Sequence, residues 1–148
     1  MHHVSIRTAD IHRAIAFYEQ LGFNISERFT TGYTLACWME GIGSRIELIQ
    51  IPEPNPAPNI FADLHYVGYY HLSFDVTEYS INLSSYLNYL QDIFIQKSQE
   101  NPEKFQPLVV MLGPTQQKIG DSIYEVAFIS DTDGLPVEII RILTTLKC

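Results

Sequence analysis

Two short stretches of this 148-residue chain match each other: His3-Val4-Ser5-Ile6 near the start and His71-Leu72-Ser73-Phe74 in the middle. Both alternate apolar and polar residues, as a half-buried strand does. An acidic residue and a segment of helical periodicity follow each stretch. Each half then closes on another matched strand, Ile46-Glu47-Leu48-Ile49 in the first and Val137-Glu138-Ile139-Ile140 in the second. A duplicated module is the simplest interpretation of this pattern.

The first copy is expected to run strand, helix and three strands. Residues 2–8 alternate like a strand, and Asp10 stands where a carboxylate can cap the following helix. Apolar residues then recur at helical spacing as far as Gly22, which favours a helix end. Three further strands are predicted between turn residues, at 24–30, 33–40 and 44–51.

A proline-rich stretch at 52–60 excludes both helix and central strand and is typical of an extended linker. The pattern then restarts with a strand at 69–76 and a helix at 80–98, and strands follow at 107–112, 122–130 and 135–142. The apolar stripe of this helix contains Leu83, Leu87, Leu90 and Phe94. A loop around 113–120 and the longer helix are expected to contain the extra residues of the second copy. We therefore predict one α+β domain over 1–148, with module one at 1–51, a linker at 52–65 and module two at 66–143.

Composition narrows the class of protein. Hydrophobic residues make up 46% of the chain, which is enough for a packed core. The net charge is −8 and the nine Lys and Arg residues are scattered, so neither nucleic acid nor an anionic membrane is an expected partner. The two cysteines form no disulfide framework and fit a reducing cytosol, so a cytoplasmic location is expected. No run of 18 apolar residues is present.

Strand parity groups the polar residues of the two copies. If Val4 and Ile6 face the helices, His2 shares their side and His3 lies on the opposite face. The same parity sets His71 apart from its apolar neighbours. Glu47 and Glu138 are flanked by apolar residues, where an ionised carboxylate is costly unless it is paired or bound to a metal. A lone strand histidine is more often structural, but two imidazoles and two carboxylates at equivalent positions suit a divalent transition metal with open positions.

The motifs together resemble the vicinal oxygen chelate superfamily, which includes glyoxalase I, bleomycin resistance proteins, epimerases and extradiol dioxygenases. The matches cover almost the whole chain: His3-x-x-x-Arg7, the helix from Asp10 to Tyr18 followed by Leu21-Gly22-Phe23, Ile46-Glu47-Leu48, His71-Leu72-Ser73-Phe74, and Asp131-Thr132-Asp133-Gly134-x-x-Val137-Glu138. The last match is the sharpest, although Thr132 stands where the family usually has proline.

This resemblance implies two βαβββ modules that form an open, barrel-like curved sheet around a metal cleft. The implied ligands are His3, Glu47, His71 and Glu138, which are expected to converge on one divalent cation (Zn, Ni, Co, Mn or Fe). In glyoxalase-like members the metal polarises the substrate's oxygens and stabilises an enediolate while a carboxylate removes the neighbouring proton. Glu138 is the expected base, and Glu47 is able to serve on the other face.

The resemblance also suggests substrate contacts. Arg7 is expected to bind a substrate carboxylate or, equally, to pair with Asp75, and Lys118 is a candidate basic contact. The leading prediction is a glyoxalase I-like lyase or isomerase that acts on a small carbonyl compound or its thiol adduct. The alternatives are a metal-free drug-sequestering protein, an Fe(II) extradiol dioxygenase that uses His3, His71 and Glu138, and an acyl-CoA epimerase. A homodimer is expected, with the modules paired within one chain or exchanged between two.

Overall fold

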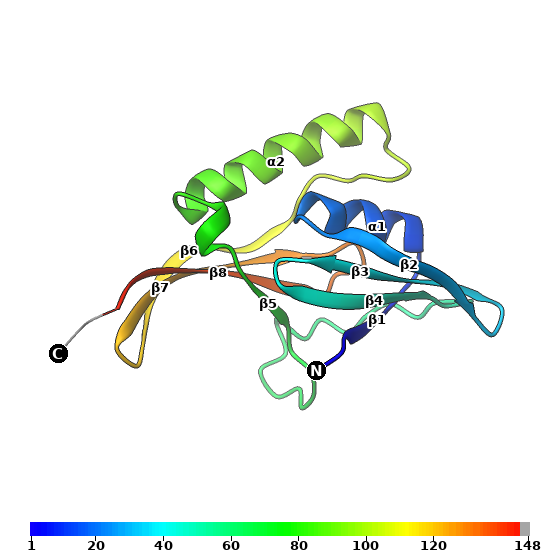
Figure 1. Cartoon of the computed structure of the whole chain (residues 1–148), viewed down its shortest axis with the longest axis horizontal. Coiled ribbons are helices and arrows are strands. Elements are labelled where there is room, and N and C mark those ends of the chain that lie inside the picture. The colour runs from blue at the N-terminus through cyan, green and yellow to red at the C-terminus, as the bar shows by residue number, and fades with distance from the viewer. Residues whose placement is uncertain (146–148) are drawn as a thin grey trace.

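The predicted repeat is present in the computed structural model, which describes residues 1–145 (Figure 1). The first module contains β1 (Val4–Thr8), α1 (Ile11–Gln20), β2 (Asn24–Thr31), β3 (Thr34–Gly41) and β4 (Ser44–Gln50). The second contains β5 (Leu72–Asp75), the 3-10 helix η1 (Thr77–Tyr79), α2 (Leu83–Glu100), β6 (Val110–Ile119), β7 (Ser122–Ser130) and β8 (Pro136–Thr145). The α+β class and the two βαβββ modules are confirmed. Among the described residues, no helix is long and apolar enough to cross a membrane.

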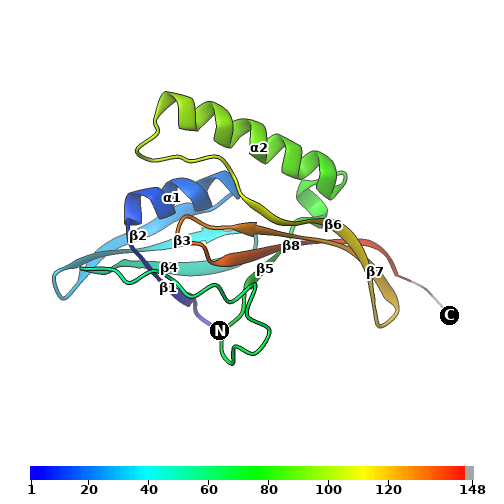
Figure 2. The same ribbon diagram turned by 180° about the vertical axis from the view of Figure 1, so that it is seen from behind.

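Each module forms its own four-stranded mixed sheet, in the orders β1-β4-β3-β2 and β5-β8-β7-β6. The edge strands β1 and β5 pair in parallel with β4 and β8, and the other pairs are antiparallel. Both helices lie on the same side of these curved sheets, which do not close into a barrel (Figures 1 and 2). The opposite side is therefore open to the linker and to solvent.

One hydrophobic core joins the two modules. The predicted stripe of α2 is buried, and the apolar side chains of α1 are buried beside it. Aromatic contacts cross the module boundary: the ring centroids of Phe17 and Phe94 are 5.6 Å apart, and those of Phe23 and Phe74 are 5.2 Å apart. Because each helix shares this core with the other module, the modules pack as a single unit.

The turn between β7 and β8 attaches the second module to the first through hydrogen bonds. Asp133 accepts hydrogen bonds from the Thr8 hydroxyl at 2.6 Å and from the Ala9 N–H at 3.0 Å. Buried Asp131 accepts one from the Tyr18 hydroxyl at 3.1 Å. This turn belongs to the sharpest motif of the sequence, and its observed contacts hold the β1–α1 corner against the second sheet.

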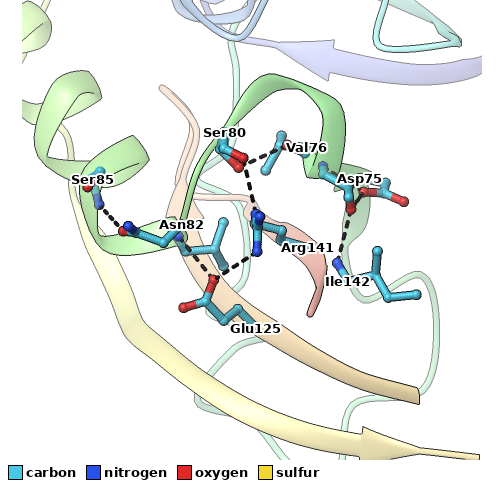
Figure 3. Close-up of polar contacts among 10 residues, drawn as sticks. Asp75, Val76, Ser80, Asn82, Ser85, Glu125, Arg141 and Ile142 are labelled. Carbon is cyan, nitrogen blue, oxygen red and sulfur yellow. Dashed lines mark hydrogen bonds and ion pairs between the residues drawn. The ribbon is translucent and has the colours of Figure 1, made fainter. Parts of the chain in front are cut away.

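Side-chain contacts also set the start of α2 (Figure 3). Asn82 caps this helix by accepting the Ser85 N–H at 2.8 Å, so the helix begins at Leu83 and not at the predicted residue 80. Glu125 on β7 accepts the Leu83 N–H at 3.2 Å. Arg141 on β8 donates to the Ser80 carbonyl at 3.1 Å, so both neighbouring strands hold the segment that leads into the helix.

The predictions of a loop at 113–120 and of a short strand at 107–112 were wrong. The strand β6 starts at Val110 and continues to Ile119 along β7. Gly113 and Pro114 interrupt the strand pattern in the sequence, but β6 is an edge strand, where a missing N–H is tolerated. Two register shifts between Val110 and Thr115 accommodate these residues. The predicted strand at 69–76 is shorter and begins at Leu72.

The burial of Asp131 predicts a pH-dependent stability. Burial raises the pKa of its carboxyl from 3.8 to about 6, although backbone N–H groups of Leu135 and Asp133 oppose the shift. The folded state therefore holds this proton more tightly than the unfolded chain does. The stabilisation is fully present below the ordinary pKa and is lost as the pH rises through about 6. Relative to Asp131→Asn, the wild type is expected to lose about 2–3 kcal/mol of unfolding free energy between acidic and neutral pH.

Urea denaturation of both proteins across this pH range measures the difference. Asparagine keeps an oxygen for the two backbone N–H groups and an amide that can donate to Tyr18, so the variant is expected to fold. Asp92→Asn on the exposed side of α2 is the matched control for the loss of one negative charge. A difference between wild type and Asp131→Asn that stays constant with pH would contradict the prediction.

Candidate metal centre in two half-sites

The four predicted ligands lie on the face of the sheets that points away from the helices. On β4, Ile46 and Leu48 are buried in the core, and the alternation of the strand turns Glu47 to the other side. On β8, the buried residues Val137 and Ile139 flank Glu138 in the same way. Burial of the apolar neighbours therefore decides where both carboxylates point.

The first half-site consists of His3, Ser5, Trp38 and Glu47, from β1, β3, β4 and the residue before β1. The Nε2 atom of His3 lies 3.5 Å from Oε1 of Glu47. The Ser5 hydroxyl donates to the same oxygen at 2.8 Å, and the Trp38 indole N–H donates to Oε2 at 2.8 Å. The parallel register that places Ser5 beside Glu47 brings these groups together.

The second half-site consists of His71, Ser73, Phe128 and Glu138 and repeats this arrangement. The Nε2 atom of His71 lies 3.7 Å from Oε2 of Glu138, and the Ser73 hydroxyl donates to Oε1 at 2.6 Å. Phe128 pairs with Glu138 across β7 and β8 as Trp38 pairs with Glu47 across β3 and β4. The duplication therefore preserves the histidine, the serine and the glutamate, and it exchanges an indole for a phenyl ring.

The four predicted ligands of one chain form two separate pairs, and they do not meet around one point in the described part of the chain. Within residues 1–145, no three His, Cys, Asp or Glu side chains lie close enough together to hold an ion. His3 and His71 instead border an open hollow of about 770 Å³ between the β1 and β5 edges. Each half-site nevertheless offers one imidazole and one carboxylate with their heads side by side, and this donor set fits half of the coordination shell of a divalent transition metal.

The two carboxylates differ in their hydrogen-bond donors. Burial opposes ionisation of Glu47, but hydrogen bonds from Trp38 and Ser5 outweigh it, and the pKa of this carboxyl is lowered. Glu138 receives a hydrogen bond from Ser73, and the phenyl ring beside it has no N–H to offer. Glu47 is thus held as an anion whose two oxygens both accept side-chain hydrogen bonds. In the described part of the chain, only Oε1 of Glu138 accepts one.

Aromatic side chains flank both half-sites. Phe29 on β2 packs against Trp38 with ring centroids 5.5 Å apart. The linker between β4 and β5 runs on the side away from the helices (Figures 1 and 2) and places Phe61 at 5.3 Å from Phe128. Tyr70 at the end of the linker stacks on Phe128 at 6.1 Å and contacts His71 at 4.6 Å. Each histidine–glutamate pair therefore has an apolar wall beside it.

The structure separates the two candidate substrate contacts from each other. Arg7 is exposed on β1 and, within the described part of the chain, makes no ion pair with Asp75. Asp75 instead accepts the Thr77 N–H at 2.9 Å and helps to form the turn into η1. Lys118 is exposed near the tip of the β6–β7 hairpin. Substrate binding by Arg7 and Lys118 stays a prediction.

Sequence reasoning missed several residues that touch the first half-site. His2 was expected on the helix side, but it precedes β1, is exposed and packs on Trp38 with ring centroids 5.0 Å apart. Arg45 lies over the same indole at 5.6 Å. Strand parity does place the two serines on the histidine face, because Ser5 and Ser73 occupy equivalent positions of the repeat, but it does not show that they donate to the glutamates. No sequence signal marked His2 or Arg45.

Comparison with known proteins agrees with this architecture. A profile described as the Glyoxalase/Bleomycin resistance protein/Dioxygenase superfamily matches residues 1–85. No curated protein sequence matches the chain significantly.

Solved structures share the fold at low sequence identity. A glyoxalase family protein from Bacillus cereus is 19% identical over 97% of this chain and 94% of that chain, with a TM-score of 0.65. One from Enterococcus faecalis is 17% identical over 95% and 96% of the two chains, with a TM-score of 0.66. A bleomycin resistance determinant encoded on the transposon Tn5 is 18% identical over 95% and 96%, with a TM-score of 0.58. Since the profile covers more than half of the chain and the fold agrees, the protein belongs to the glyoxalase/bleomycin resistance protein/dioxygenase superfamily.

Proposed function

We propose that this protein is a metal-dependent lyase or isomerase that acts on a small carbonyl compound or its thiol adduct. The observation that carries the proposal is the repeated histidine–glutamate pair, His3 with Glu47 and His71 with Glu138, on one open face of the two sheets. Parallel strand pairs of the same register hold both pairs. Two such pairs supply four nitrogen and oxygen ligands to a divalent transition metal and leave positions open for substrate.

A second copy of the chain is part of this proposal. Because no three candidate ligands within residues 1–145 lie close enough together to hold an ion, each half-site needs a partner that carries the complementary half. In a two-fold dimer, contact between the first half-site of one copy and the second half-site of the other creates two equivalent sites. Both half-sites lie on the same face, so a single interface can join them twice.

The residues then have distinct roles. A divalent metal held by the two pairs would supply Lewis-acid chemistry, by withdrawing charge from neighbouring substrate oxygens. Glu138 has one oxygen, Oε2, that accepts no hydrogen bond from the described residues. This oxygen accepts the proton from the carbon beside the carbonyl group and returns it to the adjacent carbon. Glu47 stays ionised through its two hydrogen bonds and balances the charge of the metal. Ser5 and Ser73 orient the two carboxylates.

A small-molecule binding protein is the second candidate. The aromatic walls around Trp38 and Phe128 favour it, since apolar rings bind drug-like ligands without any metal. The fold is also similar to that of the Tn5 bleomycin resistance determinant. Metal content after purification without chelator separates the candidates: about one Zn, Ni, Fe, Mn or Co per chain supports the enzyme, and a site that stays empty on titration supports the binder.

Mixing two defective variants tests the shared site. His3→Ala and His71→Ala are each expected to lose the high-affinity metal site, because every site then lacks one imidazole. Unfolded and refolded together in equal amounts, they form a mixed dimer in which one of the two sites has all four ligands. Random pairing therefore restores about a quarter of the wild-type metal sites, as measured by metal analysis after dialysis.

His12→Ala, which removes an exposed histidine on α1, is the control for the loss of an imidazole and should bind metal like the wild type. Full metal content in either single variant, or no recovery in the mixture while the wild type binds metal, would overturn the shared four-ligand site.

Substitution of the proposed base gives a separate prediction. Glu138→Gln removes the proton acceptor but keeps the side-chain shape, so turnover should fall by at least about 100-fold. Glu47→Gln should reduce turnover less, because it removes a ligand and not the base. The measurement is kcat on a panel of hemithioacetal, acyl-CoA and catechol substrates. A larger loss in Glu47→Gln would exchange the two roles, and turnover of catechol with iron would indicate a dioxygenase.

A further inference from the structure

His3 is connected to two residues outside the predicted ligand set. Its Nδ1 atom lies 2.7 Å from Nδ1 of His2, and Nε2 of His2 lies 2.6 Å from Nη1 of Arg45. Glu40 holds the guanidinium by accepting hydrogen bonds from Nε and Nη2 of Arg45, which leaves Nη1 directed at His2. The contacts thus form a continuous path from Arg45 through His2 to the first half-site.

The chemistry of the donors fixes the position of every ring proton on this path. A guanidinium donates hydrogen bonds and never accepts them, so Nε2 of His2 must be an acceptor and bears no proton. The His2 ring then carries its proton on Nδ1 and donates it to Nδ1 of His3. Nδ1 of His3 is therefore an acceptor, and the proton of that ring resides on Nε2, the nitrogen that faces Glu47 at 3.5 Å.

The second half-site has no such path. Nδ1 of His71 is buried and has no hydrogen-bond partner among the residues that the structure describes. Tyr70 and Phe128 contact the ring through their aromatic faces and edges, which do not determine its tautomer. The two duplicated histidines, equivalent in sequence, thus differ in how their protons are held.

We propose that His2 and Arg45 are positioning residues that hold His3 as the Nε2–H tautomer, with the protonated nitrogen 3.5 Å from Oε1 of Glu47. The consequence for metal binding rests on the function proposed above. A cation can bond to Nε2 of His3 only if the proton there is replaced by one on Nδ1. His3 would then release its Nε2 proton to water and accept on Nδ1 the proton that His2 carried on Nδ1, while His2 takes a proton from water on Nε2. The two rings keep the same number of protons, and the hydrogen bond from Arg45 to Nε2 of His2 is lost. The contact with Arg45 would therefore weaken the bond of a cation to His3, whereas no such contact opposes a bond to His71 among the described residues.

The test is a comparison of tautomers in the metal-free protein by two-dimensional ¹H–¹⁵N spectra of the imidazole rings, at about pH 8, where most histidines are neutral. His2→Ala and His3→Ala assign the signals. The wild type is expected to show His3 with its proton on Nε2 and His2 with its proton on Nδ1. Arg45→Met removes the donor and should convert both rings to mixtures, whereas Arg45→Lys keeps a group that only donates and should retain the wild-type pattern.

Zinc affinity provides the second measurement. Arg45→Met is expected to bind Zn²⁺ about tenfold more tightly than the wild type, because the tautomer change no longer breaks a hydrogen bond. Arg28→Met, which removes an exposed arginine of the same sheet, should change neither the spectra nor the affinity. Circular dichroism confirms that each variant is folded.

The outcomes separate this proposal from the proposed function. A wild-type His3 with its proton on Nδ1, or spectra that do not change in Arg45→Met, would overturn the positioning role even if the protein binds metal. If the spectra show the expected tautomers but neither the wild type nor any variant binds metal, the positioning role is supported and the metal site is rejected. Equal zinc affinity in the wild type and Arg45→Met would overturn the claim that this contact resists the metal.

Discussion

Side chains along β1, β4, β5 and β8 point alternately into the core and towards the open face, and this alternation sets both the packing and the geometry of the site. Ile46, Leu48, Val137 and Ile139 are each no more than 1% exposed, and a shift of one residue in either strand would move these side chains into solvent. Their burial therefore excludes other registers. It also leaves Glu47 and Glu138 on the opposite face, where the parallel neighbours bring Ser5 and Ser73 beside them. Stability of the core and geometry of the site thus have the same cause.

The packing of the two modules decides how the half-sites are related. Both helices share one core, and Asp131 and Asp133 fasten the second sheet to Thr8, Ala9 and Tyr18 of the first module. This association is mainly apolar and is reinforced by these hydrogen bonds, of which the one from Tyr18 to Asp131 is buried, so it holds the sheets side by side with their polar faces on the open side. The arrangement explains why the two histidine–glutamate pairs of one chain stay apart on the same face.

Duplication has produced two copies that are similar in backbone and different in electrostatics. The exchange of Trp38 for Phe128 gives Glu47 an additional N–H donor that Glu138 lacks. The path from Arg45 through His2 is likewise confined to the first copy. In the proposed reaction these differences would give the two half-sites separate roles, with Glu47 holding charge and Glu138 moving a proton.

Local sequence patterns were enough to predict most of the elements and the two faces of the strands. The periods of two and of about 3.6 residues depend on local geometry, so β1, α1 and β4, the buried stripe of α2, and the separation of Glu47 from its apolar neighbours were all predictable. The separation of the four candidate ligands into two pairs could not be predicted, because it depends on how the two helices share a core across a long linker. The same holds for β6, where pairing with β7 overrides the local effect of Gly113 and Pro114. The path to His3 was also unpredictable, since Arg45 reaches His2 only once β1 and β4 lie side by side.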